Sequence, residues 1–154
     1  MTKQRTLVVA VALFSAGAVL ALDAAAQAKP EVLVKQRQAA MTMIGKYFGP
    51  LGAMARGKAA YNADVVKRNA GYLEVLAQLP WDGFHESTKG EKSAALPAVF
   101  EKSSEFKQGA ERLQNEVAKL ASVSKSGDES AVKSQIAAVG KACGGCHDNF
   151  REKR

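Results

Sequence analysis

The sequence predicts an all-α protein, an antiparallel four-helix bundle, and three observations lead to this fold class. The chain has 154 residues, of which 47% are hydrophobic, enough for one domain with a real core. Proline is scarce, at 4 residues, whereas helix-favouring alanine, lysine, glutamine and glutamate are plentiful. Four segments space their apolar residues alternately by three and four, with mostly short connections between them, and no strand pattern or internal repeat is found.

The N-terminal segment has the organisation of a secretory signal peptide. Its first five residues carry two positive charges, and an apolar or small-residue run follows from Leu7 to Leu22. Small-x-small cleavage signals end at Ala26 and Ala28. A membrane anchor is the alternative, but the run is slightly short for one. We therefore expect residues 1–28 to be a signal peptide, cleaved near Ala26 or Ala28, and residues 29–154 to form the mature domain.

The charge of the chain argues against a nucleic-acid partner. The formal net charge is +7, but the positive residues are spread along the chain without a basic block. A solvated surface explains this pattern better than nucleic-acid binding, which export also disfavours. Nothing after Ala28 is long and apolar enough to span a bilayer, so we expect no membrane association after cleavage.

The first predicted helix runs from about Glu31 to Arg56. Pro30 stands at its start, where proline is tolerated, and we expect Pro50 to kink it. The second predicted helix runs from about Ala63 to Gln78, with Asn62 as its N-cap. The two apolar stripes are Val34, Arg37, Met41, Ile44 and Phe48 in the first helix and Val66, Asn69, Leu73, Leu76 and Leu79 in the second.

Residues 81–96 show no helical period and are predicted to form a long loop. Pro97 then opens the third predicted helix, which reaches about Ser122, and Asp128 caps the fourth, which reaches about Arg151. The stripes are Val99, Ser103, Phe106, Ala110, Leu113, Val117 and Leu120 in the third helix and Val132, Ile136, Val139, Cys143, Cys146 and Phe150 in the fourth.

The two cysteines of the chain lie in Cys143-Gly144-Gly145-Cys146-His147, near the end of the fourth predicted helix. C-x-x-C-H is the attachment signature of c-type haem. Residues three and four apart share a helix face, so both thiols can reach the vinyl groups on one porphyrin edge, and His147 can rise beneath the iron. We therefore expect one covalent haem c per chain, held by Cys143 and Cys146, with His147 as an axial iron ligand.

Three other interpretations of the motif are weaker. A thioredoxin-like dithiol would need a strand–helix context, which this C-terminal helix does not offer. A disulfide is possible after export but would not explain the adjoining histidine. A zinc site could recruit His85, but the adjacent Cys146 and His147 cannot easily bind one ion together with Cys143. We expect His85 to be a solvent-exposed loop residue.

Two arginines are candidates for contact with the haem. Arg151 lies one helical turn beyond His147, so it can lie beside the proximal imidazole or simply complement the helix dipole. Arg37 interrupts the apolar stripe of the first helix. Its side chain could reach solvent, but a haem propionate would be a natural partner for a guanidinium, and Gln38 could assist from the adjacent position.

The whole mature chain resembles the class II cytochromes c, and specifically the cytochrome c prime family. The C-terminal motif is the most specific part of the resemblance. The matching segments are Lys29-Pro30-Glu31, Arg37-Gln38-x-x-Met41, Leu79-Pro80-Trp81-x-x-Phe84 and Cys143-x-x-Cys146-His147-Asp148-x-x-Arg151.

The resemblance implies a left-handed four-helix bundle with a pentacoordinate, high-spin haem, in the periplasm of a Gram-negative bacterium. It implies that Met41 covers the distal face of the iron without binding it, and that Arg151 lies on the proximal side. The other family positions carried over are Arg37 and Gln38, which would contact propionates, and Trp81 and Phe84, which would enclose the haem.

The first functional hypothesis is binding of nitric oxide or carbon monoxide by a haem protein that is not an enzyme, with a periplasmic redox partner left open. It rests on an apolar cover on the distal side and on the lack of an evident sixth ligand. The alternative is a low-spin, six-coordinate electron-transfer cytochrome with Met41 as sixth ligand, because low-spin relatives have a ligating methionine at this position. Peroxidase chemistry needs a polar acid–base group, and no residue near Met41 supplies one. A haem-free structural bundle does not account for the motif. We expect Met43 and Met54 to be packing residues.

A homodimer is also implied by the resemblance. The first predicted helix carries Leu33, Ala40 and Leu51 partly off its haem-facing stripe. These residues could form a self-complementary contact about a two-fold axis.

Overall fold

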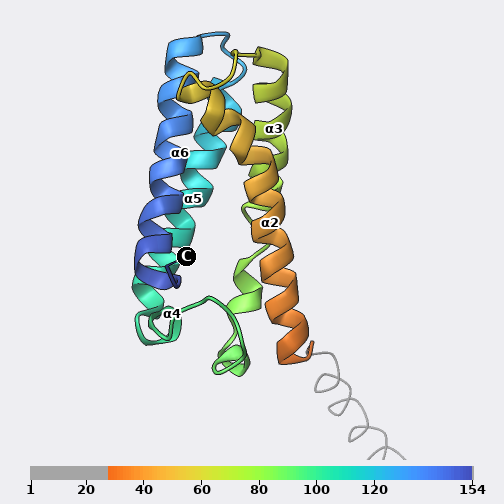
Figure 1. The fold of residues 1–154 in the computed structure, drawn as a ribbon, viewed down its shortest axis with the longest axis vertical. Coiled ribbons are helices and arrows are strands. Elements are labelled where there is room, and N and C mark those ends of the chain that lie inside the picture. The colour runs from red at the N-terminus through yellow and green to blue at the C-terminus, as the bar shows by residue number, and fades with distance from the viewer. Residues whose placement is uncertain (1–27, 154) are drawn as a thin grey trace, which may run out of the picture.

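The computed structural model describes residues 28–153, so the predicted signal peptide lies outside the described residues apart from Ala28. Four long helices form an elongated bundle, and a fifth, one-turn helix precedes the third of them (Figure 1). The helices are α2 (Pro30–Ala55), α3 (Ala63–Leu76), α4 (Ala98–Glu101), α5 (Ser103–Val123) and α6 (Glu129–Phe150), and two 3-10 turns are η2 (Trp81–Phe84) and η3 (Glu86–Thr88). The predicted fold class is confirmed.

The boundaries of α2 follow from its terminal residues. Pro30 occupies the first turn, where its missing amide costs no hydrogen bond. The helix passes through Pro50 and ends at Ala55. Gly57 then adopts a positive φ of 69°, and its amide donates to the carbonyl of Met54 at 3.1 Å. A left-handed glycine of this kind stops a helix and satisfies one of its last carbonyls.

Helix α3 begins as predicted but ends early. The Asn62 side chain accepts a hydrogen bond from the amide of Val65 at 2.9 Å, which confirms the predicted N-cap. The helix stops at Leu76, two residues before the predicted end. The predicted burial of Leu79 is wrong, because a helical stripe holds only for helical backbone, and Leu79 in the following turn is 56% exposed.

The third predicted helix is two helices in the structure. Lys102 leaves helical backbone angles, with φ −114° and ψ 44°, and separates α4 from α5. Because of this break, the predicted helical spacing does not continue from α4 into α5. Val99 of α4 is buried, whereas Ser103, which was predicted to lie on the same helix face, is exposed. From Phe106 onward the predicted stripe of α5 holds.

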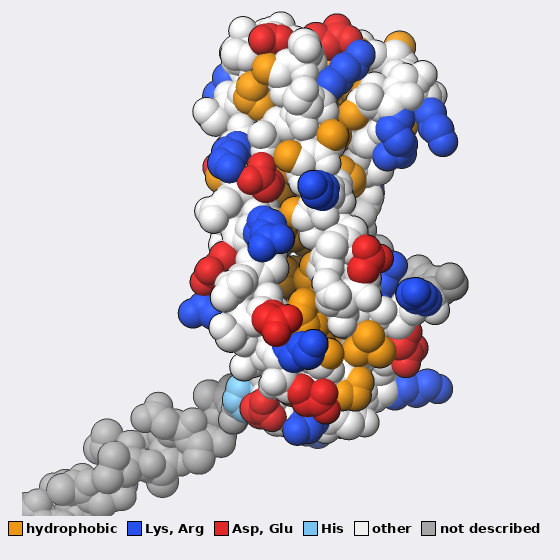
Figure 2. Space-filling view, turned by 90° about the vertical axis from the view of Figure 1, so that its left-hand side faces the viewer, with side chains coloured by type: hydrophobic (Ala, Val, Ile, Leu, Met, Phe, Trp, Pro, Cys, Tyr) orange, Lys and Arg blue, Asp and Glu red, His pale blue; other side chains and the backbone are white. Residues whose placement is uncertain are grey.

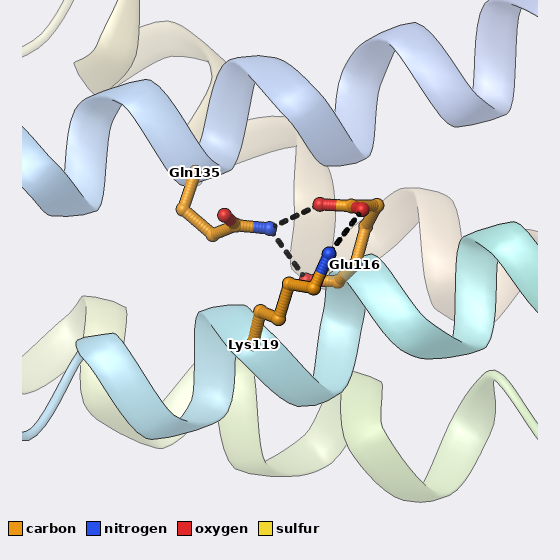
Figure 3. A network of polar contacts seen from close by, with 3 residues as sticks. All are labelled: Glu116, Lys119 and Gln135. Carbon is orange, nitrogen blue, oxygen red and sulfur yellow. Dashed lines mark hydrogen bonds and ion pairs between the residues drawn. The ribbon is translucent and has the colours of Figure 1, made fainter.

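Helix α6 is capped as predicted and is joined to α5 by polar contacts. The Asp128 side chain accepts from the amide of Ala131 at 3.0 Å. On the flank of the helix pair, the Gln135 amide donates to the Glu116 carboxylate at 2.7 Å and to its backbone carbonyl at 2.9 Å. Lys119 donates to the same carboxylate at 2.8 Å (Figure 3). These bonds fix the register of α5 against α6.

The main apolar cluster lies mostly in the half of the bundle nearer the α5–α6 turn. Its fully buried members include Leu51, Leu73, Leu120 and Ile136, one from each long helix. Helix α3 is short, with 14 residues, so beyond its end the chain segment 81–96 runs beside α2, α5 and α6 instead (Figure 1). That half of the bundle holds a cavity.

Two further expectations about single residues are decided by burial. Met54 belongs to the core, as predicted, but Met43 is 37% exposed and is not a packing residue. Leu51 is fully buried and Ala40 is nearly so, which means that neither residue can contribute to a contact between two chains. The predicted dimer contact is therefore wrong in these two residues.

No helix among residues 28–153 is long and apolar enough to cross a membrane.

Candidate functional site

A cavity of about 810 Å³ lies between α2, the segment 81–96, α5 and α6. It brings together every residue that the sequence singled out for the site. From α2 come Arg37, Gln38 and Met41, from η2 come Trp81 and Phe84, and from α6 and its end come Cys143, Cys146, His147 and Arg151. Residues more than 100 positions apart in the sequence therefore line one space.

The C-x-x-C-H motif presents three side chains to this cavity from the last two turns of α6. Cys143, Cys146 and His147 all line it and are all partly buried. Gly109 of α5 faces Cys146, and a Cβ atom built there would lie 3.6 Å from its sulfur. This is an ordinary van der Waals distance, so α5 and α6 are in contact at the level of the thiol.

The protein environment of the two thiols disfavours the thiolate. Burial raises the pKa of Cys143, the neighbouring Cys146 raises it further, and burial also raises the pKa of Cys146. No disulfide joins them. Within residues 28–153 no group of three or more histidine, cysteine or carboxylate side chains could hold a metal ion, which argues against the zinc interpretation.

Arg37 is the most buried charged residue of the site, at 3% exposure. One terminal nitrogen donates to the Gly83 carbonyl at 2.6 Å and to the Thr88 hydroxyl at 2.9 Å, and the other donates to the Ser93 hydroxyl at 2.9 Å. The guanidinium lies 4.5 Å from the centre of the Phe84 ring. Burial lowers the pKa of Arg37, and no carboxylate of the described residues forms an ion pair with it. The cavity wall thus carries a cation without a counter-charge.

The α2 face of the cavity is mostly apolar around Met41. Met41 is partly buried and Ile44 is buried, and Gly45 and Phe48 complete this stretch of the wall. Gln38 and Thr42 are exposed at its edge, where the Thr42 hydroxyl donates to the Gln38 carbonyl at 2.8 Å within the helix. No acidic or basic group other than Arg37 reaches the cavity from α2.

Four aromatic rings form a continuous wall. Trp81 and Phe84 of η2 both contact Phe106 of α5, with ring centres 5.9 Å and 4.7 Å apart, and Phe106 contacts Phe150 of α6 at 5.3 Å. The Trp81 indole donates to the Ala77 carbonyl at 2.7 Å, which fixes its ring. The sequence predicted the first two residues as part of the site but assigned Phe106 and Phe150 only to helix stripes.

Arg151 lies just beyond the end of α6. Its amide donates to the His147 carbonyl at 3.2 Å, and its backbone pairs with Ala95 of the segment 81–96. The side chain lines the cavity, and its Nε atom is buried without a hydrogen-bond partner. A buried donor of this kind is costly unless an acceptor meets it.

These features fit a haem. The cavity offers two thiols three residues apart, an imidazole, an aromatic wall and two arginines, one with an uncompensated charge and the other with an unsatisfied donor. A flat apolar ring bearing two carboxylates would match both the wall and the cations. Sequence reasoning did not find Thr88, Ser93 or Gly83, because ordinary loop residues give no pattern that signals contact with Arg37.

Comparisons with known proteins agree with this site. The family model described as cytochrome C′ matches residues 32–151. A cytochrome c′ of Halomonas halodenitrificans is 40% identical over 130 residues, which cover 80% of this chain and 98% of that protein.

Two solved structures are also similar. The cytochrome c′ structure from Rubrivivax gelatinosus has a TM-score of 0.76 and 38% identity, and covers 80% of this chain and 98% of its own. A nitric oxide complex of a cytochrome c prime variant from Alcaligenes xylosoxidans has a TM-score of 0.76 and 34% identity, with 83% and 99% coverage.

Proposed function

The chain belongs to the cytochrome c′ family, and from this premise we propose that it is a periplasmic haem protein whose pentacoordinate, high-spin iron binds nitric oxide or carbon monoxide. Proteins of this family carry covalently attached haem c with iron. Bound haem supplies an iron atom that can take a diatomic ligand and change its oxidation state. The residues of the chain hold this group, orient it and limit the access of water.

Cys143 and Cys146 are the proposed attachment sites, and His147 the proposed axial ligand. Their common position on the cavity side of α6 supports these roles. Burial raises the pKa of both thiols, which favours their protonated form. Cys143 and Cys146 would hold the haem through thioether bonds from partly buried positions on α6.

The observation that carries gas binding is the composition of the cavity wall on α2. Met41, Ile44 and Phe48 are apolar, and the Thr42 hydroxyl on the same helix donates to the Gln38 carbonyl of α2. Bound dioxygen develops negative charge and would find no donor in the side chains of Met41, Ile44 and Phe48, whereas carbon monoxide and nitric oxide depend less on such donors. The Alcaligenes relative is described as a nitric oxide complex, which supports the same ligand class here.

The remaining site residues have proposed supporting roles. Arg37, with Gln38 at the cavity edge, would pair with a propionate, because a buried cation without a counter-charge favours an anionic partner. Arg151 would lie on the proximal side of the haem, near His147. Trp81 and Phe84 would enclose the ring with their aromatic faces.

An electron-transfer cytochrome is the second candidate, because Met41 and His147 line the same cavity from different helices. Thioether ligation by Met41 would give a low-spin, six-coordinate iron. Visible spectra of the ferric and ferrous protein, before and after addition of carbon monoxide, test the proposal. We expect high-spin spectra in both oxidation states and a carbon monoxide adduct of the ferrous form. A low-spin protein that does not bind carbon monoxide would instead be an electron carrier.

A further inference from the structure

The segment 81–96, which we call the strap, is held at both of its sides. At one side Arg37 of α2 binds three of its residues, Gly83, Thr88 and Ser93. At the other side the strap meets the end of α6. There the Leu96 amide donates to the Phe150 carbonyl at 3.0 Å, and the Glu152 amide donates to the Ala94 carbonyl at 2.9 Å. The strap therefore connects the two helices that face each other across the cavity.

Thr88 is the least exposed of the polar side chains that hold Arg37, at 1% exposure. Its hydroxyl proton is directed to the His85 carbonyl at 2.7 Å. A hydroxyl has one proton and two lone pairs, so towards Arg37, 2.9 Å away, the Thr88 oxygen can act only as an acceptor. The direction of this bond is fixed by the fold of η3, and it suits a guanidinium, which can only donate.

Gly83 allows the strap to come this close to α2. A Cβ atom at this position would lie 2.6 Å from the Cβ of Arg37 and 2.8 Å from the Leu33 carbonyl oxygen. Contacts below 3.0 Å with backbone are not tolerated without a shift of the chain. The absence of a side chain thus brings the Gly83 carbonyl within 2.6 Å of the guanidinium.

All the acceptors that hold Arg37 are neutral. The guanidinium is therefore fixed in position while its charge remains available to a group inside the cavity. In a poorly solvated site a fixed charge acts strongly on its neighbours. A nearby positive charge favours the ferrous haem, which carries one positive charge less than the ferric haem.

We propose that Thr88 is a positioning residue: it fixes the guanidinium of Arg37 at the cavity wall, and through it raises the reduction potential of the haem. This inference rests on the proposed haem site. Without the Thr88 hydroxyl, one proton of the buried guanidinium has no acceptor, and the side chain turns away towards solvent. The haem then loses the nearby charge, and its midpoint potential falls.

The test compares midpoint potentials of the haem-loaded, full-length protein and its variants, measured by spectroelectrochemistry. Thr88→Val removes the hydroxyl and keeps the volume, whereas Thr88→Ser keeps the hydroxyl. We expect a lower potential for Thr88→Val and a value near that of the wild type for Thr88→Ser. Val132→Ala, in the fully buried core away from the cavity, is the matched control. It should lower thermal stability but leave the potential unchanged.

A double variant separates positioning from a direct effect. If Thr88 acts through Arg37, Arg37→Gln lowers the potential, and adding Thr88→Val lowers it no further. An unchanged potential in Thr88→Val, or an additive fall in the double variant, would overturn the inference. An unchanged potential in Arg37→Gln would also overturn the inference, and it would count against the proposed propionate contact as well. If Thr88→Val does not fold, Thr88→Ala, with a smaller side chain, gives the same comparison.

Discussion

Cys143, Cys146 and His147 show how single residues define the site. Their spacing predicts a shared helix face, and in the structure all three line the same cavity. Their residue types predict covalent attachment of haem, whereas the rest of the site depends on how distant segments fold together. At this scale the sequence could predict the residues on α2 and α6 but not Thr88 and Ser93, because their contacts span 51 and 56 positions.

The first prediction concerns attachment of the haem. Denatured protein should retain one haem in mass spectrometry, because thioether bonds survive unfolding. His147→Ala should alter the iron spectrum or prevent maturation. His85→Ala is the matched control, because His85 is exposed on the strap and lies outside the cavity lining. Haem released by acidic organic solvent, or a large spectral change in the His85 variant, would contradict these assignments.

The second prediction concerns Met41. If Met41 covers the iron without binding it, an incoming ligand must displace it, at a packing cost of about 1–2 kcal/mol. Met41→Ala should therefore raise carbon monoxide affinity roughly tenfold and speed association, while the resting spectrum stays high-spin. Stopped-flow mixing of the ferrous protein with carbon monoxide measures both. A low-spin wild type that becomes high-spin in the variant would show that Met41 is a ligand.

At the scale of elements, the long helices and the connections between them were predictable, whereas the break within the third predicted helix was not. Asn62 and Asp128 cap α3 and α6 as their residue types predict. The break at Lys102 has no glycine or proline to signal it. The strap was predicted as a loop without period, and its two 3-10 turns depend on contacts with α2 that local sequence does not contain.

The third prediction concerns the contact of η2 with α2. Gly83→Ala should lower the free energy of unfolding by about 1–3 kcal/mol, because the added methyl group meets backbone and Arg37. Gly71→Ala is the matched control. Gly71 is exposed in the middle of α3 with no heavy atom near its missing Cβ, so alanine should stabilise by about 0.5–1 kcal/mol. Denaturant unfolding of the haem-loaded proteins measures both changes, and equal effects would contradict the close contact.

The fourth prediction concerns the bonds between α5 and α6. Hydrogen bonds from Lys119 and then Gln135 lower the pKa of Glu116. A lowered folded-state pKa gives stability that is present above the unfolded pKa, about 4.3 for glutamate, and is lost as the pH falls through the folded value. The difference in thermal midpoint between wild type and Glu116→Gln should therefore shrink on acidification from pH 7 through this range.

Glu111 provides the control for that measurement. It lies 3.9 Å from Lys107 on the exposed face of α5, and exposed pairs of this kind contribute little to stability. Glu111→Gln should thus change the thermal midpoint less than Glu116→Gln at neutral pH. If the thermal midpoint of the wild type exceeds that of Glu116→Gln by the same amount at every pH, the hydrogen bonds to the ionised carboxylate do not stabilise the protein as expected.

At the scale of the whole molecule, the bundle is divided into a packed half and a half built around the cavity. The division follows from the shortness of α3, which ends before the level of the C-x-x-C-H motif. Figure 2 shows the side on which α5 and α6 lie, with basic and acidic side chains interspersed and apolar side chains visible between them. On this face the positive charges therefore do not gather in one patch.

Because Leu51 and Ala40 are buried, a dimer contact is expected on another surface of the protein. Leu51 and Ala40 lie inside the protomer, whereas Tyr72 and Val75 of α3 are 47% and 65% exposed. Tyr72 packs on Tyr47 of α2, with ring centres 4.9 Å apart, so these residues form one apolar surface over both helices. Sequence periodicity could not identify it, because an apolar residue off the main stripe can face either a neighbouring helix or a second chain.

The last prediction is that the α2–α3 surface joins two copies of the chain about a two-fold axis. Exposed apolar patches of this kind mark interaction sites, and a two-fold contact would bring Val75 near its own copy. Val75→Glu should then convert a dimer into a monomer in sedimentation velocity at micromolar concentration, because two buried like charges repel each other. Val32→Glu, at an exposed apolar residue near the start of α2, is the control and should leave the dimer intact. A monomeric wild type would refute the dimer itself, and a dimeric Val75→Glu would place its contact elsewhere on the molecule.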